Sequence, residues 1–403
     1  MNETIRSTEP PPITSTLVHA PLRHSAAWWK SGIIADIPGH MGAAELDWLS
    51  GSLRDYAKVG CTAILVRPSQ LDFDADSTPL TNLIEKAKNT GMRTIVRVSG
   101  GGEFINGVFT ESPSAFRYFE KGPEKTLERA RFALQHGADG IDLGFLIAPE
   151  MDPSHESSLN QLDSLVKAIH KFAYNHHPGS IVGGFALIQP ESTYQHYLDS
   201  YLFHHLRDNR LLDVAWDAKS IRDRITRTLD SRNELGQVSV WRTSSTFTDT
   251  VPQEMTKAWY QHDSGRRRRA LTMLAMALPG VVYFRGNRIL DLPWLLAEPS
   301  VKAMTADDIA HYRTMMTAAA RLRLARGLGV GSLAWVEGAP WANRDVMVQV
   351  GTHTLTVLNT SDEVITVPSG MRPLLSSEHL VLDHTDPDSQ LVRPGECAWF
   401  DAP

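Results

Sequence analysis

The stretch ALQHGADGIDLG, residues 133–144, joins the end of an amphipathic helix to a buried strand through a glycine turn. Upstream, Leu127, Ala130 and Leu134 recur at helical spacing, which predicts a helix over residues 123–136. Downstream, GIDLGFL (140–146) is a short apolar run, typical of a parallel strand that helices cover on the outside. The stretch therefore predicts one helix–strand unit of an α/β fold.

The same unit recurs along the chain from Trp28 onward. Residues 43–59 form a second amphipathic stretch, with Leu46, Leu49 and Leu53 at helical spacing. Eight strands alternating with helices predict a (β/α)8 TIM barrel over residues 25–328. The eight apolar runs are SGIIADI (31–37), CTAILVR (61–67), RTIVRVS (93–99), GIDLGFL (140–146), SIVGGFAL (180–187), LLDVAW (211–216), QVSVW (237–241) and GVVYF (280–284).

The two ends of the chain differ in character from this barrel. Residues 1–24 are rich in Pro and Thr, and we expect them to be a disordered leader. Residues 329–403 contain alternating valines and short runs such as LTVLNTSDEVITV (355–367), broken by turn residues. This pattern predicts a small C-terminal antiparallel β-sandwich domain, preceded by a linker helix at 303–327.

Composition excludes several classes of protein. The formal net charge is −6, with 40 basic and 46 acidic residues, so neither nucleic acid nor an anionic membrane surface is an expected partner. No apolar stretch approaches the roughly 18 residues of a transmembrane segment. The two cysteines, Cys61 and Cys397, match no disulfide framework or zinc motif. We therefore expect a cytoplasmic location, and we expect neither a metal nor a cofactor.

Several motifs resemble those of the alpha-amylase family of retaining glycoside hydrolases. They are AAWWKSGIIADI (26–37), LRDYAKVGCTAILVRPS (53–69), ALQHGADGIDLG (133–144), ALPGVVYFRG (277–286) and PGECAWF (394–400). The resemblance implies a barrel followed by a β-domain. It also implies chemistry by two carboxylates about 5–5.5 Å apart, one a nucleophile and the other an acid and then a base.

The positions that would carry this chemistry hold other residues here. By the resemblance, the nucleophile falls on Gly144, the acid/base on Gly184 and a third carboxylate on Ser244. The segment between Ser99 and Pro123 is only about 23 residues long, which leaves no room for the subdomain that active members insert there. The same losses make the chain similar to the extracellular domain of heteromeric amino-acid transporter heavy chains.

The polar and aromatic residues that remain define a residual cleft. Arg97 stands where the family has an aspartate, and Asp142 stands where it has an arginine. Because a buried carboxylate must be paired, we expect an Arg97–Asp142 ion pair. Trp216 and Trp241 lie near the carboxyl ends of the predicted sixth and seventh strands, where they either line the cleft or pack in the core.

Two functions follow as hypotheses. The first is a catalytically inactive alpha-amylase-family homologue that binds a protein partner or an α-glucan. The second is a divergent α-glycoside hydrolase or transglycosidase acting on α-glucosides. Such an enzyme would draw its carboxylates from other strand ends, and the candidates are Asp36, Asp142, Asp213 and Glu103.

Overall fold

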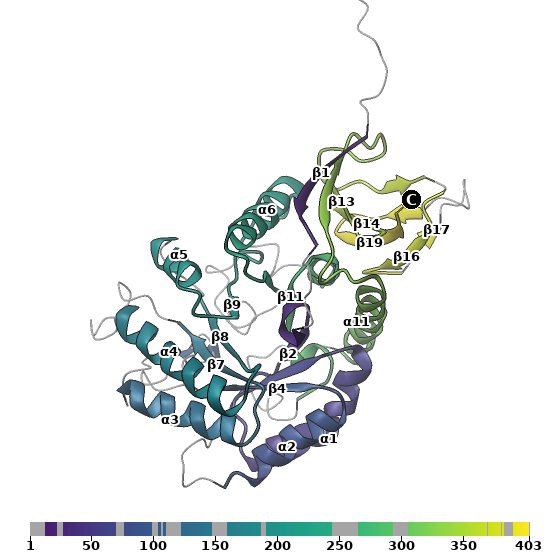
Figure 1. Cartoon of the computed structure of the whole chain (residues 1–403). Helices are drawn as coiled ribbons and strands as arrows, with labels where there is room; N and C mark the ends of the chain where they lie inside the picture. The colour runs from purple at the N-terminus through teal and green to yellow at the C-terminus, as the bar shows by residue number, and fades with distance from the viewer. Residues whose placement is uncertain are drawn as a thin grey trace, which may run out of the picture.

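The computed structural model contains a parallel barrel and an antiparallel β-domain beside it (Figure 1). No helix among the described residues is long and apolar enough to cross a membrane. The structure describes residues 13–21, 27–69, 76–98, 104–105, 108–109, 122–146, 159–186, 191–243, 265–292, 305–368, 370–379, 381–382 and 390–402.

Eight parallel strands form the barrel, in the order β10-β11-β2-β3-β4-β7-β8-β9. The two strands at the ends of this order, β9 and β10, lie next to each other, so the barrel is nearly closed. The strands are β2 (Ile33–Asp36), β3 (Ala63–Val66), β4 (Arg93–Arg97), β7 (Gly140–Phe145), β8 (Ile181–Phe185), β9 (His205–Arg207), β10 (Val240–Arg242) and β11 (Val281–Arg285).

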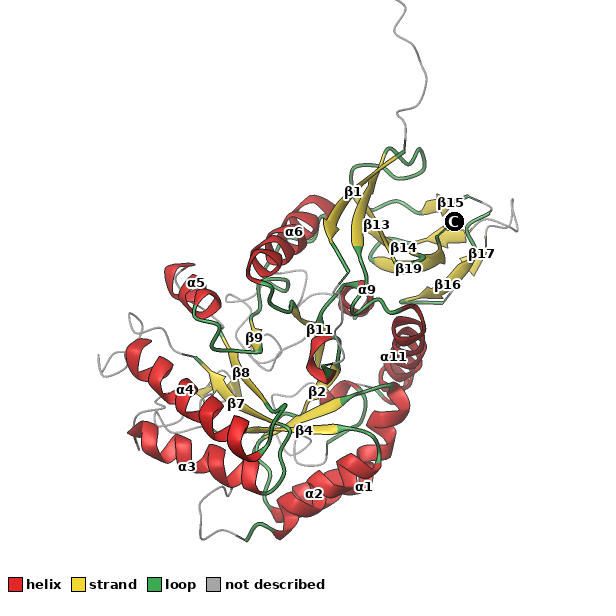
Figure 2. Cartoon of the chain, viewed as in Figure 1, coloured by secondary structure: helices red, strands yellow, loops and turns green. Residues whose placement is uncertain are grey.

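Helices cover the outside of these strands, as Figure 2 shows in red. Between strands and helices lies the larger apolar core, while a second, smaller apolar core fills the barrel interior. The helices are α1 (Ala43–Val59), α2 (Thr78–Asn89), α3 (Gly122–Gln135), α4 (Leu159–His176), α5 (Glu191–Asp199), α6 (Ala218–Leu235) and α9 (Arg266–Ala277), with the short turns η1 (Trp28–Lys30) and η5 (Gly286–Arg288).

Side chains alternate between the two cores along each strand, because successive residues of a strand point to opposite faces. In β10, Val240 belongs to the interior core and Trp241 to the outer one. In β8, Ile181 faces the interior and Val182 faces the helices. This alternation decides which residues at the strand ends point into the barrel.

The C-terminal domain follows α11 (Ala306–Arg326) and consists of two antiparallel sheets around an apolar core of their own. The predicted β-domain is therefore confirmed. One sheet has the order β1-β12-β13-β14-β19-β16 and the other β15-β18-β17. These strands are β1 (Thr14–His19), β12 (Leu333–Glu337), β13 (Val346–Gly351), β14 (Thr354–Asn359), β15 (Ile365–Val367), β16 (Pro373–Ser376), β17 (Val381–Leu382), β18 (Gln390–Val392) and β19 (Glu396–Asp401); a separate hairpin joins β5 (Phe104–Ile105) and β6 (Val108–Phe109).

Two sequence predictions differ from this fold. Within the expected leader, Thr14–His19 forms β1, which pairs antiparallel with β12, so its backbone partners lie about 320 residues later in the chain. The sixth barrel strand is β9 (His205–Arg207), not residues 211–216, which form a turn. The periodicity missed β9 because two of its three residues, His205 and Arg207, are polar and yet fully buried.

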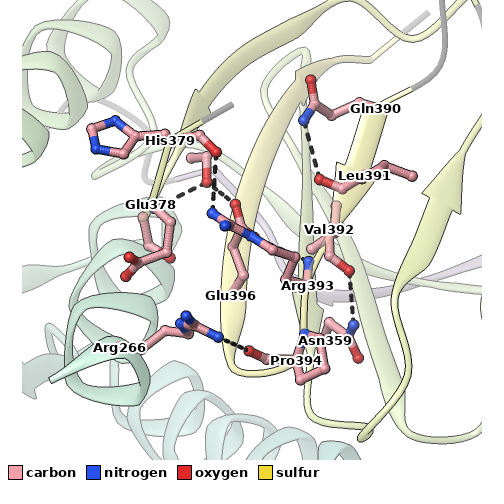
Figure 3. A network of polar contacts seen from close by, with 12 residues as sticks. Arg266, Asn359, Glu378, His379, Gln390, Leu391, Val392, Arg393, Pro394 and Glu396 are labelled. Carbon is pink, nitrogen blue, oxygen red and sulfur yellow. Dashed lines mark hydrogen bonds and ion pairs between the residues drawn. The ribbon is translucent and has the colours of Figure 1, made fainter. Parts of the chain in front are cut away.

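Arginines at the start of α9 connect the barrel to the β-domain. Arg266 donates from Nη1 to the carbonyl of Pro394 at 3.4 Å, and Arg269 donates from Nε to Glu378 Oε1 at 2.8 Å. Figure 3 shows Arg266 reaching Pro394 across the junction, next to the Arg393–Glu396 pair, whose Nε–Oε2 distance is 3.3 Å. The β-domain is thus attached through charged and backbone groups as well as through α11.

A buried arginine of α11 satisfies the end of α9. Arg323 is 3 % exposed and donates from Nη1 to the carbonyls of Met276 and Leu278, each at 2.7 Å, while its Nη2 donates to the carbonyl of Gly280. The last carbonyls of a helix have no partner within that helix and carry partial negative charge. Burial lowers the pKa of Arg323 to about 9.

Replacement of Arg323 by methionine tests this contact. Arg323→Met leaves buried carbonyls without donors, so we expect the free energy of unfolding to fall by about 3 kcal/mol in urea titrations. Arg321 lies on the exposed side of the same helix, and Arg321→Met should change stability by no more than about 0.5 kcal/mol. Equal effects of the two variants would contradict the assigned role.

Candidate functional site at the carboxyl end of the barrel

Charged side chains form the last inward-facing layer of the barrel. Each lies two positions after a residue that faces the interior, as Asp36 follows Ile34. Because every second residue of a strand faces the same side, each of these side chains points toward the barrel axis. Carboxyl ends of barrel strands are where active sites of this fold lie. The layer comprises Asp36, Arg67, Arg97, Asp142, Arg207, Arg242 and Arg285, and all except Arg97 are less than 9 % exposed.

Asp142 is the centre of this layer. It is fully buried, and its Oδ1 accepts from Arg97 Nε at 2.8 Å and from the backbone N–H of Gly144 at 3.0 Å. Its Oδ2 accepts from Arg207 Nη1. The predicted Arg97–Asp142 ion pair is therefore confirmed, and Arg207 is a second partner that the sequence analysis missed.

These contacts keep Asp142 ionised. Burial by itself would raise the pKa of this carboxyl, but the charges and hydrogen bonds of Arg207 and Arg97 outweigh burial and lower the pKa well below its ordinary range. A carboxyl group that is ionised at neutral pH has no proton to give. Asp142 is therefore not suited to act as a general acid.

Asp36 extends the ion pairs to a third and a fourth strand. Its Oδ1 lies 3.3 Å from Arg97 Nη2, and its Oδ2 lies 3.5 Å from Arg242 Nη2. The chain of contacts thus runs from β9 through β7 and β4 to β2 and β10. We call its five members the mouth cluster: Asp36, Arg97, Asp142, Arg207 and Arg242.

A glycine in β8 makes the central contact of the mouth cluster possible. Strand β8 lies between β7 and β9, so the Arg207–Asp142 pair must pass over it. A Cβ atom on Gly183 would lie 3.1 Å from Asp142 Oδ2 and 3.4 Å from Arg207 Nη1. Because Gly183 has no side chain, the guanidinium and the carboxylate meet across the strand.

The family's catalytic positions are placed as follows. Gly144 has φ +64°, a backbone conformation that favours glycine, and its N–H is bound to Asp142. A Cβ atom on Gly184 would lie 2.9 Å from Leu146 Cδ1 and 3.1 Å from Phe203 Cε1, which is the apolar outer side of β8. Ser244 lies outside the described residues.

The other sequence candidates are not brought into the mouth cluster. Trp241 is 2 % exposed, packs in the outer core, and donates from Nε1 to the carbonyl of Pro279 at 2.7 Å, so it does not line the barrel end. Trp216 lies in the turn before α6 under the guanidinium of Arg267, 5.6 Å from the ring centroid. Asp213 is exposed in the same turn region, and Glu103 lies outside the described residues.

Arg207 and Arg242 are the members of the mouth cluster that the sequence analysis did not select. Each lies two residues after a residue that faces the barrel interior. Because every second residue of a strand faces the same side, extending the run 237–241 by one residue would have identified Arg242 as inward-facing. Arg207 gave no such signal because its strand was not recognised.

Among the described residues, no group of three or more His, Cys, Asp or Glu side chains is arranged to hold a metal ion.

Comparisons with solved structures find the same architecture in several enzymes. Similar solved structures include an alpha-amylase from H. orenii (TM-score 0.60, 12% identity, covering 93% of this chain and 100% of that one). A debranching enzyme from Nostoc punctiforme has a TM-score of 0.60 and 12% identity, and the match covers 96% of this chain and 100% of that one. A family GH13_31 enzyme has a TM-score of 0.62 and 11% identity, and the match covers 94% of this chain and 100% of that one. No protein-family model and no curated protein sequence matches the chain. At these identities the likeness establishes the fold, a TIM barrel with a C-terminal sheet domain.

Loss of the central carboxylate should be costly. Asp142→Asn leaves the buried Arg207 without its counter-charge, so we expect the free energy of unfolding to fall by about 3–5 kcal/mol in urea titrations. Glu191→Gln is the matched control, because Glu191 pairs with Arg210 at 3.0 Å on the surface. That substitution should cost no more than about 1 kcal/mol. A stable Asp142→Asn protein would show that the ion pairs do not support the barrel.

Two buried histidines should make the protein less stable in acid. Burial lowers the pKa of His204 to about 4, helped by the nearby His170, and burial lowers the pKa of His205 to about 3. The unfolded chain binds protons near pH 6.5, so it takes up protons that the folded chain refuses. Between pH 7 and pH 5 we expect a loss of about 2 kcal/mol of stability for each of the two.

Urea unfolding at several pH values checks this expectation. In the wild-type protein, His205 contacts the Tyr283 hydroxyl through Nδ1 and the Trp29 carbonyl through Nε2, each at 2.7 Å. His205→Gln should unfold more easily at pH 7 but lose less stability on acidification. His353→Gln, at an exposed histidine, should keep the wild-type slope. The same slope in all three proteins would be the contradicting result.

Proposed function

We propose that this chain binds α-glucosides at the carboxyl end of its barrel and does not hydrolyse them through Asp36 and Asp142. The ligand class is supported by the fold neighbours, which include an alpha-amylase and a debranching enzyme. The observation that carries the proposal is that both carboxylates of the mouth cluster are engaged by arginines. Each aspartate lies between two guanidinium groups.

Retaining hydrolysis needs two carboxyl groups with different roles. One must attack the anomeric carbon, and the other must be protonated so that it can donate to the leaving oxygen. Asp142 has both carboxylate oxygens committed to arginines and lies beneath the surface. The side chain of Asp36 is 12% exposed and can accept from a sugar hydroxyl, which suits binding.

A second candidate function is a divergent α-glycoside hydrolase or transglycosidase. The fold neighbours favour it over a pure binding role, because those compared above include named enzymes. Such an enzyme needs carboxylates other than Asp36 and Asp142 at the barrel end. Of the carboxylates selected from the sequence, this leaves Asp213, which is exposed, and Glu103, whose segment follows β4.

Binding and turnover measured on the same protein separate the two functions. Calorimetry with maltooligosaccharides should detect binding, and assays with maltose, trehalose and aryl α-glucosides should detect no release of glucose. Turnover that survives Asp36→Asn would establish the enzymatic candidate. If neither binding nor turnover is seen, a protein partner replaces the α-glucoside as the proposed ligand.

A variant localises the binding. Asp36→Asn removes an acceptor charge from the barrel end, so maltotriose should bind about tenfold more weakly, as expected for one charge-assisted hydrogen bond. Asp55→Asn, on the outer helix α1 and paired there with Lys58 at 3.2 Å, should leave the affinity unchanged. Equal affinities of both variants would place the ligand elsewhere on the molecule.

A further inference from the structure

Arg207 has hydrogen-bonding capacity that the protein leaves unused. The residue is fully buried, and its Nη1 donates to Asp142. Its Nε and Nη2, both buried, have no hydrogen-bond acceptor. Its guanidinium carbon lies 5.0 Å from the ring centroid of Tyr283, which fixes the position of the plane. Buried N–H groups without an acceptor are costly, and natural structures rarely keep them without a reason.

Arg242 repeats this situation on the neighbouring strand. It is 6 % exposed, its Nε has no acceptor, and its contact with Asp36 Oδ2 is long at 3.5 Å. Its guanidinium carbon lies 4.1 Å from the centroid of the Phe185 ring. The aromatic ring holds the cation in place without supplying the oxygen acceptors that a guanidinium prefers.

The positive charges of the mouth cluster repel one another. The pKa of Arg242 is lowered to about 10, first by burial and then by the positive charges of Arg207 and Arg97, against the opposing effect of Asp36. The mouth cluster also reaches solvent on one side, since the side chains of Arg97 and Asp36 are each 12% exposed. An anion that enters past Arg97 and reaches Arg242 would relieve this repulsion.

We propose that Arg242 and Arg207 bind the oxyanionic group of the ligand, so that the protein takes an anionic glycoside, a sugar phosphate or a sugar carboxylate. Planar guanidinium groups present paired N–H donors that match the oxygens of phosphate and carboxylate. The sugar part of this ligand rests on the proposed function, whereas the anion site rests on the mouth cluster alone.

Calorimetry with the full chain in a low-chloride buffer tests the anion site. The probes are inorganic phosphate, glucose 1-phosphate and glucuronate, with maltose as the neutral comparison. We expect glucose 1-phosphate or glucuronate to bind at least about tenfold more tightly than maltose, and the stronger of the two identifies the oxyanion. Failure of all three anions to bind the wild-type protein would overturn the inference without any variant.

Variants assign the binding to the mouth cluster. Arg242→Gln should weaken anion binding by about tenfold or more, and Arg242→Lys, which keeps the charge but not the paired donors, should lie between it and the wild type. Arg227→Gln is the control, because Arg227 is exposed on α6, away from the strand ends. The urea midpoint of each variant is measured as a check that it folds. If Arg242→Gln does not fold, the affinity of Arg242→Lys for the anions tests the assignment.

The outcomes also separate this inference from the proposed function. Maltose binding that matches the anions and is unaffected by Arg242→Lys would overturn the anion site and leave the α-glucoside proposal in place. Phosphate binding that is weakened in the Arg242 variants, with no maltose binding, would support the anion site and overturn the α-glucoside proposal. Anion binding that Arg227→Gln weakens equally would place it on the surface and overturn the inference.

Discussion

The carboxylate of Asp142 is the interaction on which the end of the barrel depends. It lies on β7 and holds Arg97 of β4 on one side and Arg207 of β9 on the other, across β8. Charges that leave water lose their hydration, and only close counter-charges and hydrogen bonds compensate them. Arg207 therefore has Asp142 as its counter-charge, while Arg97 is shared between Asp142 and Asp36. Gly183 provides the space that the Arg207–Asp142 contact requires.

The same ion pairs engage both aspartates of the mouth cluster. A retaining glycosidase needs one carboxylate free to attack and one able to hold a proton. Here the aspartates at the described strand ends serve as counter-ions for arginines, which keeps Asp142 ionised and inaccessible. Fold alone does not define function, so these contacts must be considered alongside the barrel architecture.

Arginine also has structural roles away from the mouth cluster. Arg323 of α11 satisfies carbonyl groups at the end of α9, and Arg266 and Arg269 at the start of α9 contact the β-domain. Each of these contacts joins segments that lie far apart in the sequence. One helix, α9, is consequently joined to the β-domain at its start and to α11 at its end.

Periodicity in the sequence was enough to determine the barrel, the linker helix and the C-terminal β-domain, because apolar residues at spacings of two and of three to four report which faces are buried. The resemblance predicted the Arg97–Asp142 pair, because it puts opposite charges on neighbouring strands, and the register of β4 against β7 sets the two residues side by side. Only the tertiary structure revealed β1, whose partner β12 lies at the other end of the chain, and β9, whose polar side chains concealed a buried strand. Only the tertiary structure placed Arg207 and Arg242 beside the aspartates. Closure of the barrel brings together strands that are far apart in the sequence, and a local sequence pattern carries no information about such long-range contacts.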